Sequence, residues 1–301
     1  MDRGVQTPPA ADKPRSDPRT AWLGIDWREH RRWLTVGGQR VNCVELGSGP
    51  PVLLVHGLGG NWQNWLNNLP FLAAEHRVIA VDLPGFGESE MPREQITIGF
   101  YAQWVVELLA TLDIEKCVLV GNSMGGQIVA EVALTHPGLV EKLVLVSPAG
   151  ISAENFNKPA TVELMRRADR LFSFWSKQVV TRGRKLTRRR GGRRALMSWW
   201  VRNPDDLSVE LVTEIAQGTG KPGFVDALKA LTSHALRARL REIDCPVLIV
   251  WGGADRITPV RDAREFQSAI SGSRLVIYDN TGHLSMLERP EEFNALVGEF
   301  L

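Results

Sequence analysis

Short apolar runs that alternate with helix-length segments are the feature that most limits how this 301-residue chain can fold. Nearly every residue of each run is apolar, as in strands that are covered on both faces of a parallel sheet. The runs are Val52–Val55, Val78–Val81, Cys117–Val120, Leu143–Val146, Val247–Trp251 and Leu275–Tyr278. The predicted helices between and after them are Trp65–Ala74, Ile98–Leu112, Met124–Thr135, Val260–Ala269 and Pro290–Phe300. This alternation predicts a doubly wound α/β sheet.

Three other segments complete the predicted organisation. Two strand-like runs, Arg31–Val36 and Arg40–Leu46, are joined by Gly37-Gly38, which predicts a hairpin before the alternation begins. Residues 1–20 are rich in Pro, Asp and Arg and are expected to form a flexible tail. Residues 152–240 hold no convincing buried strand and are helical, aromatic and basic in character. Because strands resume afterwards, we interpret 152–240 as a helical lid inserted into a core of 21–151 and 241–301.

Composition narrows the expected location and partners. The formal net charge of +2 gives no reason to expect nucleic acid as a partner. The N-terminal stretch lacks the apolar centre of a secretory signal, and no later segment approaches the roughly 18 apolar residues of a membrane span. We therefore expect a cytoplasmic protein, with peripheral membrane contact left open.

The strongest local motif lies at Gly121-Asn122-Ser123-Met124-Gly125. A buried strand leads directly into this G-x-S-x-G sequence and an Ala/Val/Leu-rich helix follows it, which is the context of a nucleophile elbow. A serine held in a strained turn needs neighbours without side chains two residues before and after it. The motif predicts Ser123 as a nucleophile, whereas a plain Gly/Ser turn capping a helix is the alternative.

A serine needs a base, and the base needs a carboxylate to orient it. His283 follows the last predicted strand and Asp255 follows the one before it, so both are expected at the same rim of the sheet as Ser123. Asp262 and Asp279 are alternatives for the acid, and either can equally be a surface charge. The chain order Ser123, Asp255, His283 is that of α/β-hydrolases.

The loop His56-Gly57-Leu58-Gly59-Gly60 follows the strand Val52–Val55 and predicts an oxyanion hole. Its glycines allow a backbone N–H to face the nucleophile, and we assign that donor to Leu58. The second predicted donor is the N–H of Met124, directly after the serine. Removing one such donor typically costs about 2.7–4 kcal/mol of transition-state stabilisation. We expect His56 to hold the loop by hydrogen bonds.

Together these motifs resemble the α/β-hydrolase superfamily over most of residues 29–301, with the lid as the variable part. The resemblance implies a mostly parallel sheet of about eight strands, helices on both faces and a lid after the sixth strand. It also implies an acyl-enzyme on Ser123 and no cofactor or metal. The chain also resembles epoxide hydrolases and haloalkane dehalogenases at Asp82–Glu88, but those carry an aspartate where this chain has Ser123, so we exclude them.

Several activities are compatible with a serine in this setting. The first is a carboxylesterase or lipase-like activity on a small, hydrophobic ester. The second is hydrolysis of carbon–carbon bonds in aromatic ring-fission (meta-cleavage) products, whose enzymes resemble the Gly121–Gly126 sequence. Those enzymes commonly have Trp and Pro where this chain has Leu284 and Gly60. A cofactor-free perhydrolase and a non-catalytic ligand-binding protein are the remaining alternatives.

The predicted lid carries two further signals. Trp175, Trp199 and Trp200 are candidate substrate-binding residues, although they can equally pack the lid onto the core. Between Arg182 and Arg194 there are eight Lys or Arg residues and no acid. This basic run is expected to be either a solvated face or a contact with anionic membrane. The pattern makes no prediction about the oligomeric state.

Overall fold

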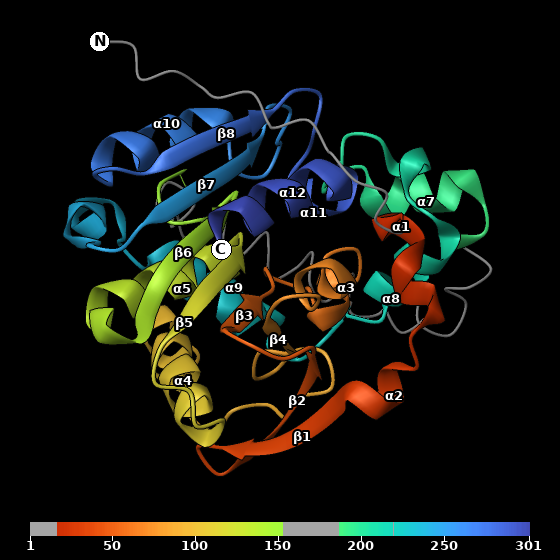
Figure 1. The fold of residues 1–301 in the computed structure, drawn as a ribbon. Coiled ribbons are helices and arrows are strands. Elements are labelled where there is room, and N and C mark those ends of the chain that lie inside the picture. Colours follow the sequence, from red (N-terminus) through yellow and green to blue (C-terminus); the bar gives the residue numbers. More distant parts are fainter. Residues whose placement is uncertain (1–16, 153–186, 219) are drawn as a thin grey trace.

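The computed structural model describes residues 17–152, 187–218 and 220–301, which contain one eight-stranded sheet (Figure 1). The strands lie in the order β1-β2-β4-β3-β5-β6-β7-β8. Their bounds are β1 Arg31–Val36, β2 Gln39–Leu46, β3 Pro51–Val55, β4 Arg77–Val81, β5 Cys117–Asn122, β6 Val140–Val146, β7 Val247–Gly252 and β8 Arg274–Tyr278. The eight predicted strands are therefore confirmed, with small differences at their ends.

Parallel pairing runs through β4, β3, β5, β6, β7 and β8, whereas β2 pairs antiparallel with both β1 and β4. The predicted hairpin joins β1 to β2. Gly37 and Gly38 both have positive φ, 58° and 75°, as a tight two-residue hairpin turn requires. The mostly parallel sheet of about eight strands predicted from the sequence is confirmed.

Helices cover both faces of this sheet. The main ones are α4 Ile98–Thr111, α5 Met124–Thr135, α10 Val260–Ala269 and α12 Pro290–Phe300. These four match the predicted helices to within one residue. Shorter elements near the N-terminus are α1 Pro18–Ala21, η1 Trp22–Gly24 and α2 Trp27–His30. Of the predicted tail, residues 1–16 lie outside the described residues and the next four begin this helical segment.

The helix predicted at Trp65–Ala74 is wrong. The chain forms two short pieces there, the 3₁₀ turn η2 Trp62–Trp65 and the single turn α3 Leu69–Leu72. Pro70 explains the break, because it lacks an N–H and its ring clashes with the carbonyl four residues earlier in a continuous helix. Near the start of α3 the same residue is tolerated.

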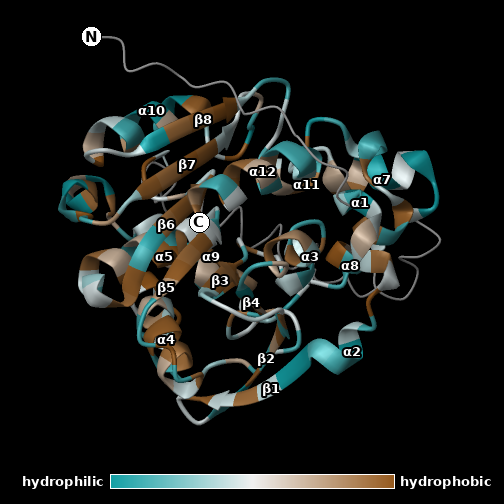
Figure 2. Cartoon of the chain, in the orientation of Figure 1, coloured by the Kyte–Doolittle hydropathy of each residue, from teal (hydrophilic) through white to brown (hydrophobic). Residues whose placement is uncertain are grey.

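Alternate residues of the strands supply two apolar cores, one on each face of the sheet. In β3, Leu53 and Val55 pack with the cluster under α4, α5 and α10, while Val52 and Leu54 pack with the cluster that contains Trp65 and Phe293. Figure 2 shows the inner strands as strongly hydrophobic, whereas β1 at the sheet edge is partly hydrophilic. Burial on both faces therefore explains the nearly continuous apolar runs.

Between β6 and β7, the described residues 187–218 and 220–242 form helices and turns. The elements are α7 Arg190–Met197, η5 Pro204–Asp206, α8 Val209–Ala216, α9 Phe224–Ser233 and η6 Arg237–Glu242. These lie in the segment predicted as a lid (152–240), a function that stays a prediction. In the described parts of the chain, no helix combines the length and the apolar content needed to cross a bilayer.

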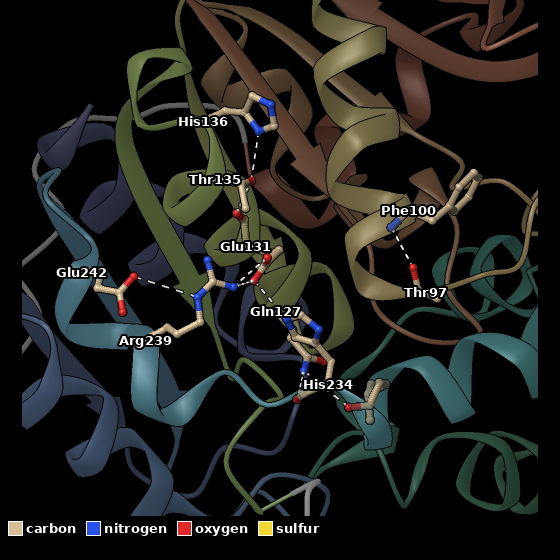
Figure 3. A network of polar contacts seen from close by, with 10 residues as sticks. Thr97, Phe100, Gln127, Glu131, Thr135, His136, His234, Arg239 and Glu242 are labelled. Carbon is tan, nitrogen blue, oxygen red and sulfur yellow. Dashed lines mark hydrogen bonds and ion pairs between the residues drawn. The ribbon is translucent and has the colours of Figure 1, made fainter.

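A buried carboxylate joins α5 to the chain that returns from this segment (Figure 3). Glu131 accepts hydrogen bonds from Arg239 at 2.9 Å and pairs with Nε2 of His234 at 3.0 Å. Gln127, one turn earlier, donates to the carbonyl of His234 at 3.2 Å. Burial raises the pKa of Glu131, but the bonds from His234 and Arg239 outweigh it and lower the pKa overall. The ionised carboxylate is thus the form that the fold stabilises.

We predict that Glu131→Gln lowers the free energy of unfolding at pH 7 by about 1.5–3 kcal/mol, the usual range for hydrogen bonds to charged groups. Because the folded pKa lies below the unfolded one, this stabilisation is present above the unfolded pKa and is lost as pH falls through the folded one. Urea unfolding measures this free energy. The difference between parent and variant should be smaller below pH 4 than at pH 7. The control is Glu242→Gln, an exposed partner of the same Arg239, which should change little. A difference independent of pH would contradict the prediction.

Candidate active site

Ser123 lies at the sharp turn between β5 and α5, with φ 56° and ψ −117°. A positive φ is unusual for a residue other than glycine and marks a strained backbone. The turn is held at both ends, because the N–H of Ser123 donates to Val146 at 2.9 Å and its carbonyl accepts from Ala149 at 3.0 Å. The predicted elbow geometry is therefore present at this serine.

The glycines of the motif are required by backbone crowding. A Cβ on Gly121 would lie 2.3 Å from the carbonyl oxygen of Gly125, and a Cβ on Gly125 would lie 2.3 Å from that of Val55. Real Cβ atoms essentially never approach so closely, and backbone atoms cannot swing away as a flexible side chain does. The close approach of β3, β5 and α5 thus depends on these two residues.

His283 and Asp255 meet at the carboxyl ends of β8 and β7. Nδ1 of His283 lies 2.7 Å from Oδ2 of Asp255, and both side chains are fully buried. Since an ionised carboxylate only accepts, Nδ1 carries the proton and Nε2 is the free base. In the described residues, Nε2 is buried without a hydrogen-bond partner. This is the arrangement needed to take a proton from a nucleophile.

Several groups keep Asp255 ionised. Burial raises the pKa of Asp255, but its interaction with His283 and the N–H groups of Ile257 and Thr258 outweigh burial and lower the pKa overall. Those N–H groups donate to Oδ1 at 2.8 and 3.0 Å. Asp255 therefore stays a carboxylate at neutral pH.

The two loops that carry the pair are in direct backbone contact. The N–H of Gly253 donates to Tyr278 and that of Ala254 donates to Thr281, both at 2.8 Å. A Cβ on Gly252 would lie 2.0 Å from the carbonyl oxygen of Gly282. The glycine at the end of β7 thus permits the approach that brings Asp255 to His283.

The alternative acids lie elsewhere. Asp262 is buried in α10 and accepts hydrogen bonds from the N–H and hydroxyl of Ser152 at 3.0 and 2.7 Å. Asp279 is exposed after β8. Of the six histidines, all in the described residues, only His283 lines the pocket beside Ser123. Geometry therefore favours Asp255 and His283 over the alternatives.

The predicted oxyanion loop packs against the serine. A Cβ on Gly57 would lie 3.0 Å from Cβ of Ser123, and Leu58 lines the same pocket. His56 is buried and accepts from the N–H of Leu83 at 3.1 Å, while its Nδ1 lies 2.7 Å from the carbonyl of Gly57. Nε2 accepts, so Nδ1 donates, and His56 holds this loop as expected. Met124 opens α5, where the first N–H groups have no acceptor within the helix.

Ser123 and His283 open into a pocket of about 550 Å³. Apolar side chains from α7, α8 and α9 form much of its wall, among them Leu196, Met197, Val212, Ile215, Phe224 and Leu228. Asn64 and Asn122 add polar groups. Among the lining residues that the structure describes, none is Lys, Arg, Asp or Glu. No group of three or more His, Cys, Asp or Glu in the described residues is placed to bind a metal ion.

Two of the three predicted substrate-binding tryptophans line this pocket. The ring of Trp200 lies 6.0 Å from that of His283, whereas Trp199 is 68% exposed. Trp175 lies outside the described residues. A substrate-binding role for Trp199 and Trp200 is thus compatible with their positions.

The described part of the basic run, 187–194, is partly neutralised. Arg194 pairs with Asp205 at 2.5 Å, and Arg190 lies 3.9 Å from the same carboxylate. Arg188 and Arg189 are exposed. Contact with anionic membrane through this run stays a prediction.

Two residues that the sequence did not single out contact the His283–Asp255 pair or its loop. The hydroxyl of Thr258 lies 2.9 Å from Oδ2 of Asp255 and 3.2 Å from Nδ1 of His283. Glu288, at the end of α11 Ser285–Glu288, accepts from the N–H of Gly282 at 2.7 Å. Thr258 could have been found from its place three residues after Asp255, whereas Glu288 carries no local signal.

Comparison with known proteins gives the family context. A family model described as the alpha/beta hydrolase fold matches residues 50–290. A 2-hydroxy-6-oxo-6-phenylhexa-2,4-dienoate hydrolase from Comamonas testosteroni is 31% identical, over 87% of this chain and 91% of its own. The dihydrolipoyllysine-residue acetyltransferase component of an acetoin cleaving system from Pseudomonas putida is 34% identical, over 88% and 68%. The crystal structure of a membrane phospholipase A, a bacterial virulence factor, is 27% identical with a TM-score of 0.71, over 94% and 91%.

We predict that Gly121→Ala destabilises the protein by about 3 kcal/mol or more, because the new methyl group would meet the backbone of Gly125, which cannot yield without moving α5. Thermal unfolding measures the effect. Gly138→Ala is the matched control, since a Cβ there meets nothing within 4 Å. Equal melting temperatures for the two variants would show that the elbow is not crowded.

Proposed function

This chain belongs to the α/β-hydrolase family, and on that premise we propose that it is a serine hydrolase that cleaves ester bonds of uncharged, hydrophobic substrates. The observation that carries the proposal is that His283, which lines the same pocket as Ser123, pairs with Asp255 at 2.7 Å. Nε2 of His283, which has no hydrogen-bond partner in the part of the chain that the structure describes, and the strained turn at Ser123 add support.

In the proposed reaction, Nε2 of His283 takes the proton of the Ser123 hydroxyl as its oxygen attacks the ester carbonyl. Asp255 stabilises the imidazolium that forms. The N–H groups of Leu58 and Met124 bind the negative oxygen of the tetrahedral intermediate. His283 then gives the proton to the departing alcohol, leaving an acyl group on Ser123. A water activated by His283 attacks the acyl-enzyme and releases the acid.

The lining of the pocket supports an uncharged substrate. Burying an ionised group without a partner of opposite charge is strongly unfavourable. The described lining offers apolar walls, two asparagines and the Ser123–His283 pair. An ester with an apolar acyl or aromatic group would find matching surroundings there, since apolar burial contributes about 25 cal/mol per Å².

A second candidate is the hydrolysis of carbon–carbon bonds in ring-fission products. The relative from Comamonas testosteroni, named as a dienoate hydrolase, favours it at 31% identity. Such a substrate carries a carboxylate, for which the described lining provides no Lys or Arg. Turnover of p-nitrophenyl esters of increasing chain length, beside a ring-fission dienoate, separates the two. A perhydrolase would reveal itself by forming peracid from a carboxylic acid and peroxide.

We predict that Ser123→Ala folds normally and loses at least about 10⁴-fold in kcat on p-nitrophenyl esters, because only the oxyanion hole and substrate binding remain. A fluorophosphonate probe should label the parent and leave the variant unlabelled. Activity within tenfold of the parent would refute Ser123 as the nucleophile. Absence of labelling in the parent would favour a non-catalytic binding protein.

We predict that Asp255→Asn lowers kcat by about 10³–10⁴-fold and changes KM far less, since the imidazole loses both its orientation and its counter-charge. Steady-state kinetics measures both constants. Asp279→Asn is the control, because Asp279 is exposed and lies beyond the pocket lining. A larger loss in Asp279→Asn than in Asp255→Asn would show that the acid is wrongly assigned.

A further inference from the structure

We propose that Glu288 is a positioning residue that fastens the loop carrying His283 to the pocket segment Trp200–Asn203. The proposal rests on the proposed function, because the position of His283 matters for turnover only if His283 is the base. The hydrogen bonds of the Glu288 carboxylate go to backbone N–H groups and not to Ser123 or the imidazole of His283. It acts through the backbone on either side of it.

The carboxylate of Glu288 binds two stretches of chain that are remote in sequence. Oε1 accepts from the N–H of Gly282, the residue before His283, at 2.7 Å. Oε2 accepts from the N–H groups of Arg202 and Asn203 at 2.8 and 3.4 Å. One side chain thus holds the histidine loop on one oxygen and the pocket segment on the other.

The same two stretches are also in direct contact. The N–H groups of His283 and Leu284 donate to the carbonyl of Trp200 at 2.8 and 3.2 Å. A Cβ on Gly282 would lie 2.8 Å from the nitrogen of Arg202. The two backbone segments, 282–284 and 200–203, are therefore in direct contact at a junction, and the carboxylate of Glu288 binds both of them.

Only a carboxylate satisfies this junction on both sides. It has acceptors on both oxygens and no donor, whereas an amide has an acceptor on one side and two donors on the other. Burial raises the pKa of Glu288, although its backbone N–H partners and Arg289 oppose the rise. Glutamine would fit the space and would set its NH₂ against a backbone N–H on one side.

The junction reaches the pocket through Trp200. The carbonyl of Trp200 anchors His283, and the ring of Trp200 faces the imidazole at 6.0 Å. Glu288 therefore connects the segment that carries Trp200, a residue of the pocket wall, to the loop that carries His283. Within the predicted lid (152–240), the segment Trp200–Asn203 is tied to the histidine loop and would keep its place if other parts of the lid moved.

The test compares Glu288→Gln and Glu288→Ala with the parent. We expect kcat on a p-nitrophenyl ester to fall about ten- to hundredfold in Glu288→Gln, as small misplacements of a catalytic group do, and KM to change less than threefold. Glu288→Ala should lose at least as much. A purely structural role would lower the melting temperature and leave kcat unchanged in the folded enzyme.

Glu45→Gln is the matched control. Glu45 is another largely buried carboxylate that binds several donors, from Arg32 and Arg77. Its partner Arg77 is the first residue of β4, whereas the pocket lies beyond the carboxyl ends of the parallel strands. Glu45→Gln should lower the melting temperature and leave kcat within twofold of the parent. An equal loss of kcat in Glu45→Gln and Glu288→Gln would overturn the positioning role, as would an unchanged kcat in folded Glu288→Gln.

Hydrogen exchange read by mass spectrometry tests the junction without turnover. Peptides covering 198–204 and 279–287 should exchange faster in both Glu288 variants and at the parent rate in Glu45→Gln. Unchanged exchange in both peptides would overturn the fastening. If the parent neither cleaves esters nor reacts with fluorophosphonate, the proposed function fails, and exchange still decides whether Glu288 fastens the two segments.

Discussion

The structure depends on one geometric constraint, the parallel pairing of the strands from β4 to β8. Parallel strands end at the same edge of the sheet, so the loops after β3, β5, β7 and β8 gather there. These loops carry Leu58, Ser123, Asp255 and His283. Leu58, Ser123 and His283, separated by up to 225 positions in the chain (58 to 283), thereby line one pocket, and Asp255 pairs with His283.

Glycines allow the segments that carry the site residues to approach one another closely. Gly121 and Gly125 let β3, β5 and α5 touch through their backbones, and Gly252 does the same for the loops after β7 and β8. At each of these glycines, main-chain atoms of the neighbouring segment occupy the space that a side chain would need. The loops after β7 and β8 are in addition joined by backbone hydrogen bonds. The strained φ of 56° at Ser123 is held by this framework.

Two carboxylates, Asp255 and Glu288, contact His283 or its loop. Asp255 is the buried carboxylate that faces His283, and Glu288 lies one step further out, on the backbone of the histidine loop. The described walls are otherwise apolar or neutral. An uncharged substrate would therefore leave the Asp255–His283 pair as the dominant electrostatic feature of the site.

Local patterns were enough to predict most of the fold and to propose the main site residues. Apolar runs marked the strands, because strands buried on both faces are mostly apolar. G-x-S-x-G marked Ser123, because crowding excludes a side chain at Gly121 and Gly125. The apolar pattern alone predicted one helix at Trp65–Ala74, but Pro70 does not fit the interior of a continuous helix there. Tertiary structure decided what depends on distance between remote segments: Asp255 rather than Asp262 or Asp279 beside His283, Thr258 against both, and Glu288 across the junction with Trp200–Asn203. No local pattern encodes the contacts of Asp255 and Glu288, since a carboxylate looks the same in sequence whether its partner is water, a guanidinium or a backbone brought from 86 residues away.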